Sequence, residues 1–99
     1  MAKELPLICP GEILLEEFLK PLGISQNKLA RDIDVPVSRI AAIIKGDRAI
    51  TADTALRFGA YFGTSAEMWM NMQADHDLRR ARRRDWPAIR DRIRKMEAA

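Results

Sequence analysis

The sequence has 99 residues, a net charge of +3 and 47% hydrophobic residues, which is enough for one hydrophobic core but not for two. No apolar run approaches the roughly 18 residues that span a bilayer, and the N-terminus lacks the layout of a signal peptide, so we expect a cytoplasmic protein without a membrane partner. The single cysteine, Cys9, excludes an internal disulfide and a zinc site built from paired cysteines.

Positive charge is concentrated in the last quarter of the chain. Residues 76–99 hold nine Lys and Arg against four Asp and Glu, whereas residues 1–75 hold eight against ten. We therefore divide the chain into an N-terminal arm (1–9), a folded domain (10–75) and a basic C-terminal helical extension (76–99). The charge balance permits nucleic acid binding without requiring it.

The first predicted helix runs from Pro10 to about Lys20 and is ended by Pro21 and Gly23. The side expected to face inward carries Leu14, Leu15, Phe18, Leu19 and Leu22. The opposite side carries Glu12, Glu16 and Glu17. This acidic side is either solvated or meets a basic partner, and carboxylates one helical turn apart are more often surface groups than a catalytic pair.

Residues 25–46 are predicted to form two short helices joined by a tight turn. Ser25 can cap the first helix with its hydroxyl group. Asp34 lies where the chain must turn sharply, and we expect it in the left-handed conformation that aspartate tolerates better than most residues. Pro36 opens the second helix, and Gly46 is placed to end it.

The outer face of the second helix lacks the long charged side chains that a surface helix normally carries. Its inner side holds Ile40, Ile43 and Ile44. At 100° per residue, the opposite side is centred on Ser38, Ala42 and Lys45. We therefore expect something to pack closely against this face, either the major groove of DNA or another helix.

Docking of DNA on this face would give several side chains definite roles. Ser38 could hydrogen-bond a base edge, and Val37 or Ala42 could contact a thymine methyl group. Arg39 could reach a guanine or a phosphate. Each of these roles is a prediction that depends on the face being open.

A loop at residues 46–50 follows, flanked by two cations. Lys45 and Arg48 are candidates for phosphate contacts that set the register, and the alternative is two solvated charges. Thr51 is predicted to cap the next helix, which Gly63 ends. Its expected buried side consists of Ala55, Leu56, Gly59 and Phe62.

A further helix is predicted to start at Thr64 or Ser65, each of which can act as its cap. Trp69 is assigned to the core because a Trp and Met stripe at helical spacing is usually buried. Met68 and Met70 are candidate dimer contacts.

The C-terminal segment changes composition abruptly and offers no catalytic chemistry. His76 is the only histidine, and nothing in the chain supplies the further ligands of a zinc site or a catalytic triad, so we predict no enzyme, metal or cofactor. Asp85 is predicted to cap a last basic helix with Pro87 in its first turn. One stripe of that helix would contain Trp86, Ile89, Ile93 and Met96. The stripe could fold back, pair with a second copy, dock on a partner or lie on an anionic membrane.

One spaced motif resembles a known family. The pattern Ile24-Ser25-Gln26-xx-Leu29-Ala30-xx-Ile33-x-Val35-xxxx-Ile40-xx-Ile43-xx-Gly46 is similar to the helix-turn-helix of the lambda repressor-like, or XRE, family. The wider runs PGEILLEEFLKPLGIS at 10–25 and IIKGDRAITADTALRFGAYFGTSAEMWMNMQ at 43–73 resemble the HigA-type antitoxins of bacterial toxin–antitoxin modules. Asp34 and Pro36 depart from the pattern, since the family usually has a turn glycine and often a hydroxyl cap there.

The resemblance implies an all-α fold, with a five-helix domain followed by a C-terminal amphipathic helix. It implies that Gln26 binds a phosphate, and that Val37, Ser38, Arg39 and Ala42 lie at or near the bases. It also implies an antitoxin that neutralises a HigB-like ribonuclease toxin and represses its own operon. Because one recognition helix reads only a few base pairs, we expect a homodimer on two half-sites of double-stranded operator DNA. The alternatives are a regulator without a toxin and an interaction module that no longer binds DNA.

Overall fold

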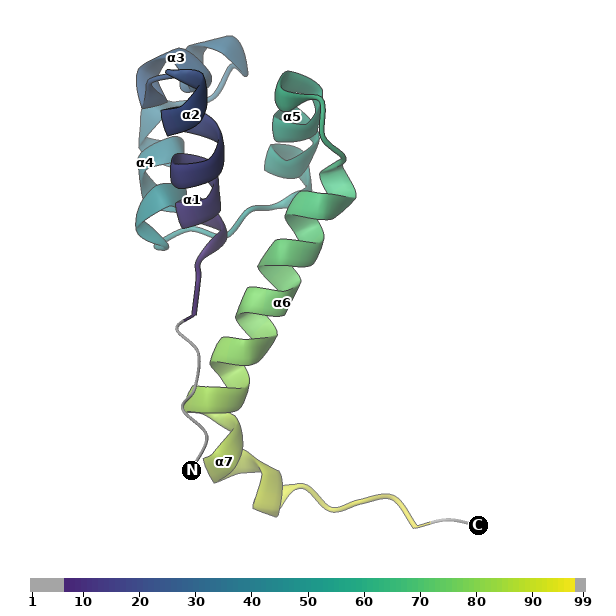
Figure 1. Ribbon diagram of the computed structural model, residues 1–99. Coiled ribbons are helices and arrows are strands. Elements are labelled where there is room, and N and C mark those ends of the chain that lie inside the picture. The colour runs from purple at the N-terminus through teal and green to yellow at the C-terminus, as the bar shows by residue number, and fades with distance from the viewer. Residues whose placement is uncertain (1–6, 98–99) are drawn as a thin grey trace.

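The computed structural model describes residues 7–97, which contain helices and no strand. The helical segments are α1 (Pro10–Ile13), η1 (Leu14–Leu19), α2 (Lys20–Leu22), α3 (Gln26–Asp32), α4 (Val37–Lys45), α5 (Ala52–Phe62), α6 (Ala66–Arg84), α7 (Trp86–Ile89) and η2 (Arg90–Arg92). The first three join end to end as one helix. The predicted all-α architecture of five core helices and a C-terminal helix is confirmed (Figure 1). Of the predicted arm, residues 7–9 are non-helical and the rest lies outside the described range.

The first helix continues past its predicted end and through Pro21 to Leu22. Its middle segment η1 is a π-helix, in which the Lys20 amide donates to the Leu15 carbonyl, five residues back. Proline has no amide hydrogen, and its ring needs space near the preceding turn, which the wider π-helical turn provides. Gly23, with φ of 66°, then ends the helix in the left-handed conformation.

Trp69 lies at the centre of the hydrophobic core and is fully buried, as predicted. Its ring centroid lies 5.0 Å from those of Phe18 and Phe58, and its indole N–H donates to the Thr64 hydroxyl at 2.9 Å. The other buried apolar side chains are Leu14, Leu19, Leu29, Ala30, Ile33, Ile40, Ile43, Ile50 and Ala55. The core therefore joins α1–η1, α3, α4, α5 and α6 into one body.

Two residues predicted to be buried are exposed. Leu22 is 60% exposed, because it lies at the very end of the first helix, beyond the helices that pack on it. Leu56 is 64% exposed, because the buried side of α5 is centred on Phe58 and Ala55 and Leu56 falls on the other side. The sequence analysis missed Phe58, which replaces Leu56 in the core.

Close helix packing depends on two glycines. A Cβ atom on Gly11 would overlap the Ile43 carbonyl oxygen and lie 2.6 Å from the Ile43 carbonyl carbon, so the start of the first helix touches the backbone of α4. A Cβ atom on Gly59 would lie 2.9 Å from the Thr64 carbonyl oxygen. Gly59 is buried, as predicted, whereas the close contact of Gly11 was not predicted.

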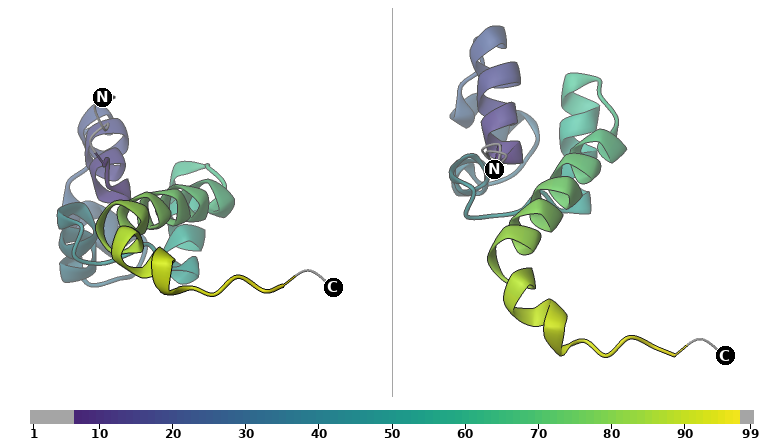
Figure 2. Two further views of the ribbon diagram at one scale, coloured as in Figure 1. Left: turned by 90° about the horizontal axis from the view of Figure 1, so that it is seen from below. Right: turned by 60° about the horizontal axis from the view of Figure 1, so that its bottom comes forward.

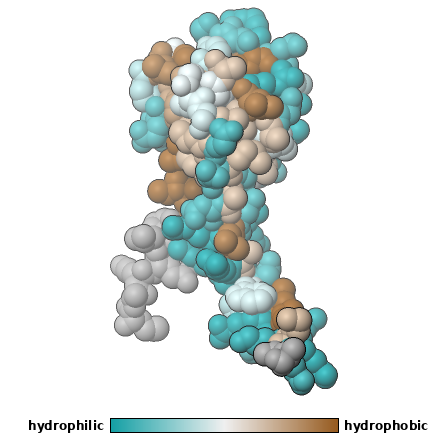
Figure 3. Space-filling view, turned by 90° about the vertical axis from the view of Figure 1, so that its right-hand side faces the viewer, coloured by the Kyte–Doolittle hydropathy of each residue, from teal (hydrophilic) through white to brown (hydrophobic). Residues whose placement is uncertain are grey.

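Helix α6 passes through residue 76 without a break, so the predicted boundary between 75 and 76 does not coincide with a helix end. Ser65 is its cap, accepting from the Met68 amide at 3.1 Å. The second half of α6 leaves the globular part and leads to α7 (Figures 1 and 2). The surface of this protruding part is mainly hydrophilic (Figure 3). Within residues 7–97, no helix has both the length and the apolar character needed to cross a bilayer.

The predicted last helix is shorter than expected. Pro87 lies in the first turn of α7, as predicted, but Asp85 makes no side-chain cap hydrogen bond. Helical structure ends at Arg92, and Ile93 is extended, so Ile93 and Met96 do not continue the apolar stripe. A short helix without tertiary contacts is marginal in water, which explains why periodicity alone was misleading here.

Candidate nucleic-acid interface

Helices α3 and α4 form a helix-turn-helix whose local signals act as predicted. The Ser25 hydroxyl accepts from the Lys28 amide at 3.0 Å. Asp34 adopts φ of 60°, the left-handed conformation expected for it, and the next amide, of Val35, donates to the Ala30 carbonyl at 3.0 Å. At the end of α4, Gly46 has φ of 83°. Both helices are therefore closed where the sequence indicated.

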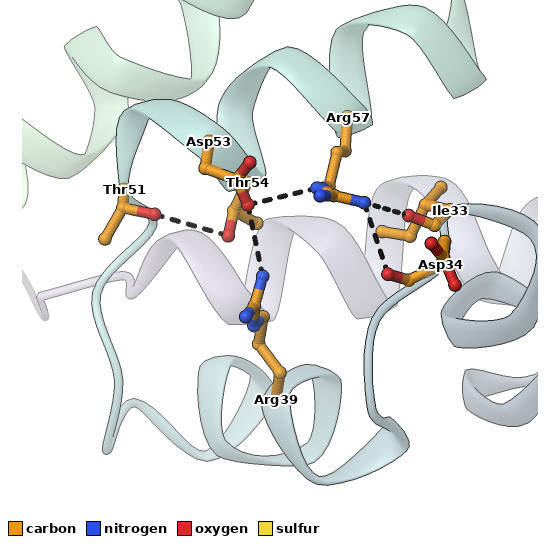
Figure 4. Close-up of polar contacts among 7 residues, drawn as sticks. All are labelled: Ile33, Asp34, Arg39, Thr51, Asp53, Thr54 and Arg57. Carbon is orange, nitrogen blue, oxygen red and sulfur yellow. Dashed lines mark hydrogen bonds and ion pairs between the residues drawn. The ribbon is translucent and has the colours of Figure 1, made fainter.

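Helix α5 holds the turn through Arg57 (Figure 4). Its Nη1 donates to the carbonyl oxygens of Ile33 at 2.6 Å and Asp34 at 3.2 Å, and its Nε donates to Asp53 at 3.0 Å. The same Asp53 oxygen accepts from Nη1 of Arg39 on α4 at 3.2 Å. Hydrogen bonding to Arg57 is the main cause that lowers the pKa of Asp53, and the charges of both arginines add to it.

A second polar contact from α5 reaches the end of α3. The Tyr61 hydroxyl donates to Asp32 at 2.9 Å, and the Lys28 ammonium donates to the same oxygen at 2.8 Å. Hydrogen bonds from Lys28 and then Tyr61 lower the pKa of Asp32. The sequence analysis missed this row of α5 residues. Its spacing of four, at Asp53, Arg57 and Tyr61, was a signal that could have identified it.

The ridge, defined as Ser38, Ala42 and Lys45, is open on the surface of the chain. Ser38 and Lys45 are exposed and Ala42 is half-buried, whereas Ile40 on the inner side is fully buried. Val37, at the start of α4, is 43% exposed. No helix of residues 7–97 covers the ridge, so the predicted alternative of an internal helix packing on it is not realised within the chain.

The two predicted phosphate-contacting cations are available. Lys45 and Arg48 are exposed, and neither forms an ion pair within the described part of the chain. Lys20 and Lys28, in contrast, are each paired with a carboxylate at 2.8 Å. The loop that carries Arg48 is tied down next to it, because the Ile50 amide donates to the side chain of Gln73 on α6 at 2.8 Å. This anchor was also not predicted.

The remaining two candidates lie beside the ridge. Gln26 is half-buried in the first turn of α3. Arg39 runs along the flank of α4 towards Asp53, and its side chain is only 24% exposed. Its Nε is buried and has no hydrogen-bond partner among residues 7–97. Four of the seven predicted residues are therefore exposed, Gln26 and Ala42 are half-buried, and Arg39 is directed into a contact with α5.

Metal ligands do not gather elsewhere in the described residues, where no group of three or more His, Cys, Asp or Glu could hold an ion. His76 is half-buried in a groove between residues 7–13 and α6, and its Nδ1 has no hydrogen-bond partner in the described part of the chain. Cys9 is half-buried near Gly46.

Comparison with known families decides what kind of helix pair this is. The family model described as helix-turn-helix matches residues 15–69, which include α3, the turn, α4 and α5. The chain belongs to this helix-turn-helix family.

Individual relatives show more specifically which members of the family this chain resembles. Virulence-associated protein I of Dichelobacter nodosus is 54% identical over 79% of this chain and 72% of its own length. Antitoxin HigA-1 of Vibrio cholerae is 37% identical over 69% of this chain and 64% of its own length. The solved structure of the Pseudomonas aeruginosa antitoxin HigA with the higBA promoter has a TM-score of 0.87 and 39% identity, over 93% of this chain and all of that one. The predicted resemblance to HigA-type helix-turn-helix proteins is confirmed.

Proposed function

We propose that this protein is an antitoxin that binds double-stranded operator DNA as a homodimer, represses its own operon and neutralises a HigB-like ribonuclease toxin. The DNA-binding part rests on the open ridge on α4, which ends in Lys45, and on Arg48 in the next loop; neither cation forms an ion pair within residues 7–97. A structural relative over nearly the whole chain was solved with promoter DNA, which supports the same use of this surface.

The ridge suits close approach to a duplex. The major groove, about 12 Å wide, admits an α-helix, and small side chains let the helix backbone lie near the base edges. Ser38 is placed to hydrogen-bond a base, and Val37 and Ala42 to contact thymine methyl groups. With so few polar side chains on this face, DNA shape and phosphate contacts supply much of the binding.

Phosphate contacts come from residues around the ridge. Lys45 is the last residue of α4, Arg48 lies in the loop that follows, and Gln26 stands at the start of α3, so the three can contact the backbone on both sides of the groove. Arg39 contacts a base edge or a phosphate at the flank of α4. These contacts position the helix, and the ridge and Arg39 supply the sequence preference.

A homodimer follows from the size of the site. One helix reads only a few base pairs, and two half-sites about 34 Å apart on one face of the duplex match a two-fold dimer. Met68 and Met70 on α6 are our candidates for the dimer contact, and Met70 is 37% exposed. The basic C-terminal extension is a further surface available to partners.

The toxin part of the proposal rests on the likeness to HigA antitoxins. The competing function is a transcriptional regulator without a toxin. We infer a cytoplasmic protein with no enzymatic activity and no cofactor, since its relatives include an antitoxin and transcriptional regulators. If the adjacent reading frame encodes a small basic protein that co-purifies with this chain, the antitoxin function stands. If the two proteins do not associate, the regulator is the correct function.

Binding to the protein's own upstream region tests the DNA-binding part. Fluorescence anisotropy with a duplex from that region and a random duplex of equal length should give a preference of at least about 10³-fold. Equal affinities would refute sequence-specific binding, and absence of binding to either duplex would leave an interaction module.

A further inference from the structure

One carboxylate oxygen serves two arginines at the flank of the recognition helix. Oδ2 of Asp53 accepts from Nε of Arg57 at 3.0 Å and from Nη1 of Arg39 at 3.2 Å. Figure 4 shows Arg39 rising from α4 to meet Asp53 at the start of α5. The two arginines therefore share one acceptor oxygen, but they differ in the number of other hydrogen bonds they make.

Arg57 is held at several points. Besides Asp53, it donates to two backbone carbonyl oxygens of the turn, those of Ile33 and Asp34. Within the described residues, the one polar contact of Arg39 is with Asp53, whose side chain is 57% exposed. Its Nε is buried without an acceptor, and its other terminal nitrogen makes no hydrogen bond to the described residues. Loss of Asp53 would consequently release Arg39 and leave Arg57 in place.

An exposed ion pair contributes little to stability and exchanges readily. Phosphate oxygens and the edge of a guanine can both accept two hydrogen bonds from a guanidinium, and either must first displace the Asp53 contact. Only the guanine of a matching site lies in the register that the ridge fixes, so only there does the gain outweigh the loss of Asp53. Moving Arg39 from Asp53 to DNA therefore adds little binding free energy on random DNA and more on a matching site. This difference would turn an ordinary surface ion pair into a determinant of specificity.

We propose that Asp53 is a specificity-determining residue, which competes with DNA phosphates for Arg39 and gives it up only to a matching operator. The inference rests on the proposed DNA-binding function and adds a residue that need not touch DNA. Asp53 thereby lowers binding to random sequence, because each phosphate contact that it withholds would raise affinity for every duplex.

The test compares Asp53→Asn with wild type on an operator duplex and a random duplex over about 50 to 200 mM salt. The substitution keeps the size of the side chain and one acceptor oxygen, and Arg57 stays bound to the turn. We expect affinity for random DNA to rise about three- to tenfold and its salt slope to steepen by about 0.9, as one added phosphate contact requires. Affinity for the operator should rise less, because the ridge fixes the register there.

Asp47→Asn is the matched control, since Asp47 is an exposed loop residue near the same surface and forms no ion pair within residues 7–97. It changes the net charge equally without releasing an arginine. Equal effects of Asp53→Asn and Asp47→Asn on random DNA would overturn the proposal. Asp53→Asn in an Arg39→Gln background should likewise behave no differently from Asp47→Asn, and a remaining excess would overturn it.

Arg39→Gln alone keeps the proposal testable if Asp53→Asn folds poorly. It should lower affinity for the operator about tenfold and leave affinity for random DNA within about twofold, since Arg39 is held by Asp53 on random sequence. Equal losses on both duplexes would overturn the proposal. If wild type itself shows no preference for the operator, the proposed function fails instead, so the two failures are distinguishable.

Discussion

Replacement of Gly11 by alanine should strongly destabilise the protein. The new Cβ would overlap the Ile43 carbonyl oxygen and would lie 2.6 Å from the Ile43 carbonyl carbon and 2.7 Å from the Ile44 Cα. A comfortable contact between two carbon atoms is about 3.5 to 4.0 Å, so the first helix and α4 must separate by about 1 Å. Because all three atoms are backbone, no side-chain rotation relieves the clash.

Overpacking by one methyl group typically costs about 1 to 3 kcal/mol, and a clash with backbone belongs at the upper end. At about 3 kcal/mol, and about 4 to 8 °C per kcal/mol for a domain of this size, Tm should fall by about 12 to 24 °C. Urea denaturation followed by circular dichroism measures the loss of unfolding free energy. Operator affinity should also fall, since α4 would be displaced from its scaffold.

Two control variants separate the clash from other effects. Glu12→Ala changes an exposed neighbour on the same helix and should stay within about 0.5 kcal/mol of wild type. Gly23→Ala adds a Cβ that meets nothing within 4 Å but sits at φ of 66°, so it should cost about 1 to 2 kcal/mol from backbone strain alone. If Gly11→Ala lowers the free energy of unfolding as little as Glu12→Ala does, the first helix and α4 do not pack as described.

Three further predictions concern the interface and its supports. Arg48→Ala should weaken binding to all duplexes and lower the salt slope by about 1; an unchanged slope would remove Arg48 from the phosphate contacts. Ala42→Leu should leave Tm within a few degrees but reduce operator affinity at least about tenfold in anisotropy, and undiminished affinity would mean that the ridge does not enter the groove. Asp32 and Asp53 have lowered pKa values in the fold, so the stability they add is present above the unfolded pKa of about 4 and is lost as pH falls below it, through the lower pKa values of the folded protein. Changing both to Asn should flatten the fall in Tm between about pH 5 and 3, and an unchanged acid profile would contradict this.

The helix-turn-helix could be predicted because its signals are local. Ser25 caps a helix whose first turn it adjoins, and Gly46 ends a helix that immediately precedes it. The left-handed conformation of Asp34 could also be predicted, because only a few residues connect the two helices and the chain must turn sharply there. The open ridge followed from the periodicity of the isoleucines on the other side of α4.

What escaped prediction depends on residues far apart in the sequence. Arg57 contacts a carbonyl 24 residues earlier, and Gly11 touches α4 more than 30 residues later. Neither partner can be identified from spacing within one helix. Leu56 and the last helix were predicted wrongly for a related reason. An apolar side chain is buried, and a short helix is stabilised, only where another element packs against it.

The unbroken course of α6 has a mechanical consequence. Because α6 is one continuous helix, the number of residues between its first and last turns fixes both the distance and the rotation between them. Insertion of one residue in the protruding half of α6 would turn everything downstream by about 100° and advance it by about 1.5 Å. Relatives that keep a partner-binding surface beyond this helix should therefore tolerate substitutions along it far better than insertions or deletions.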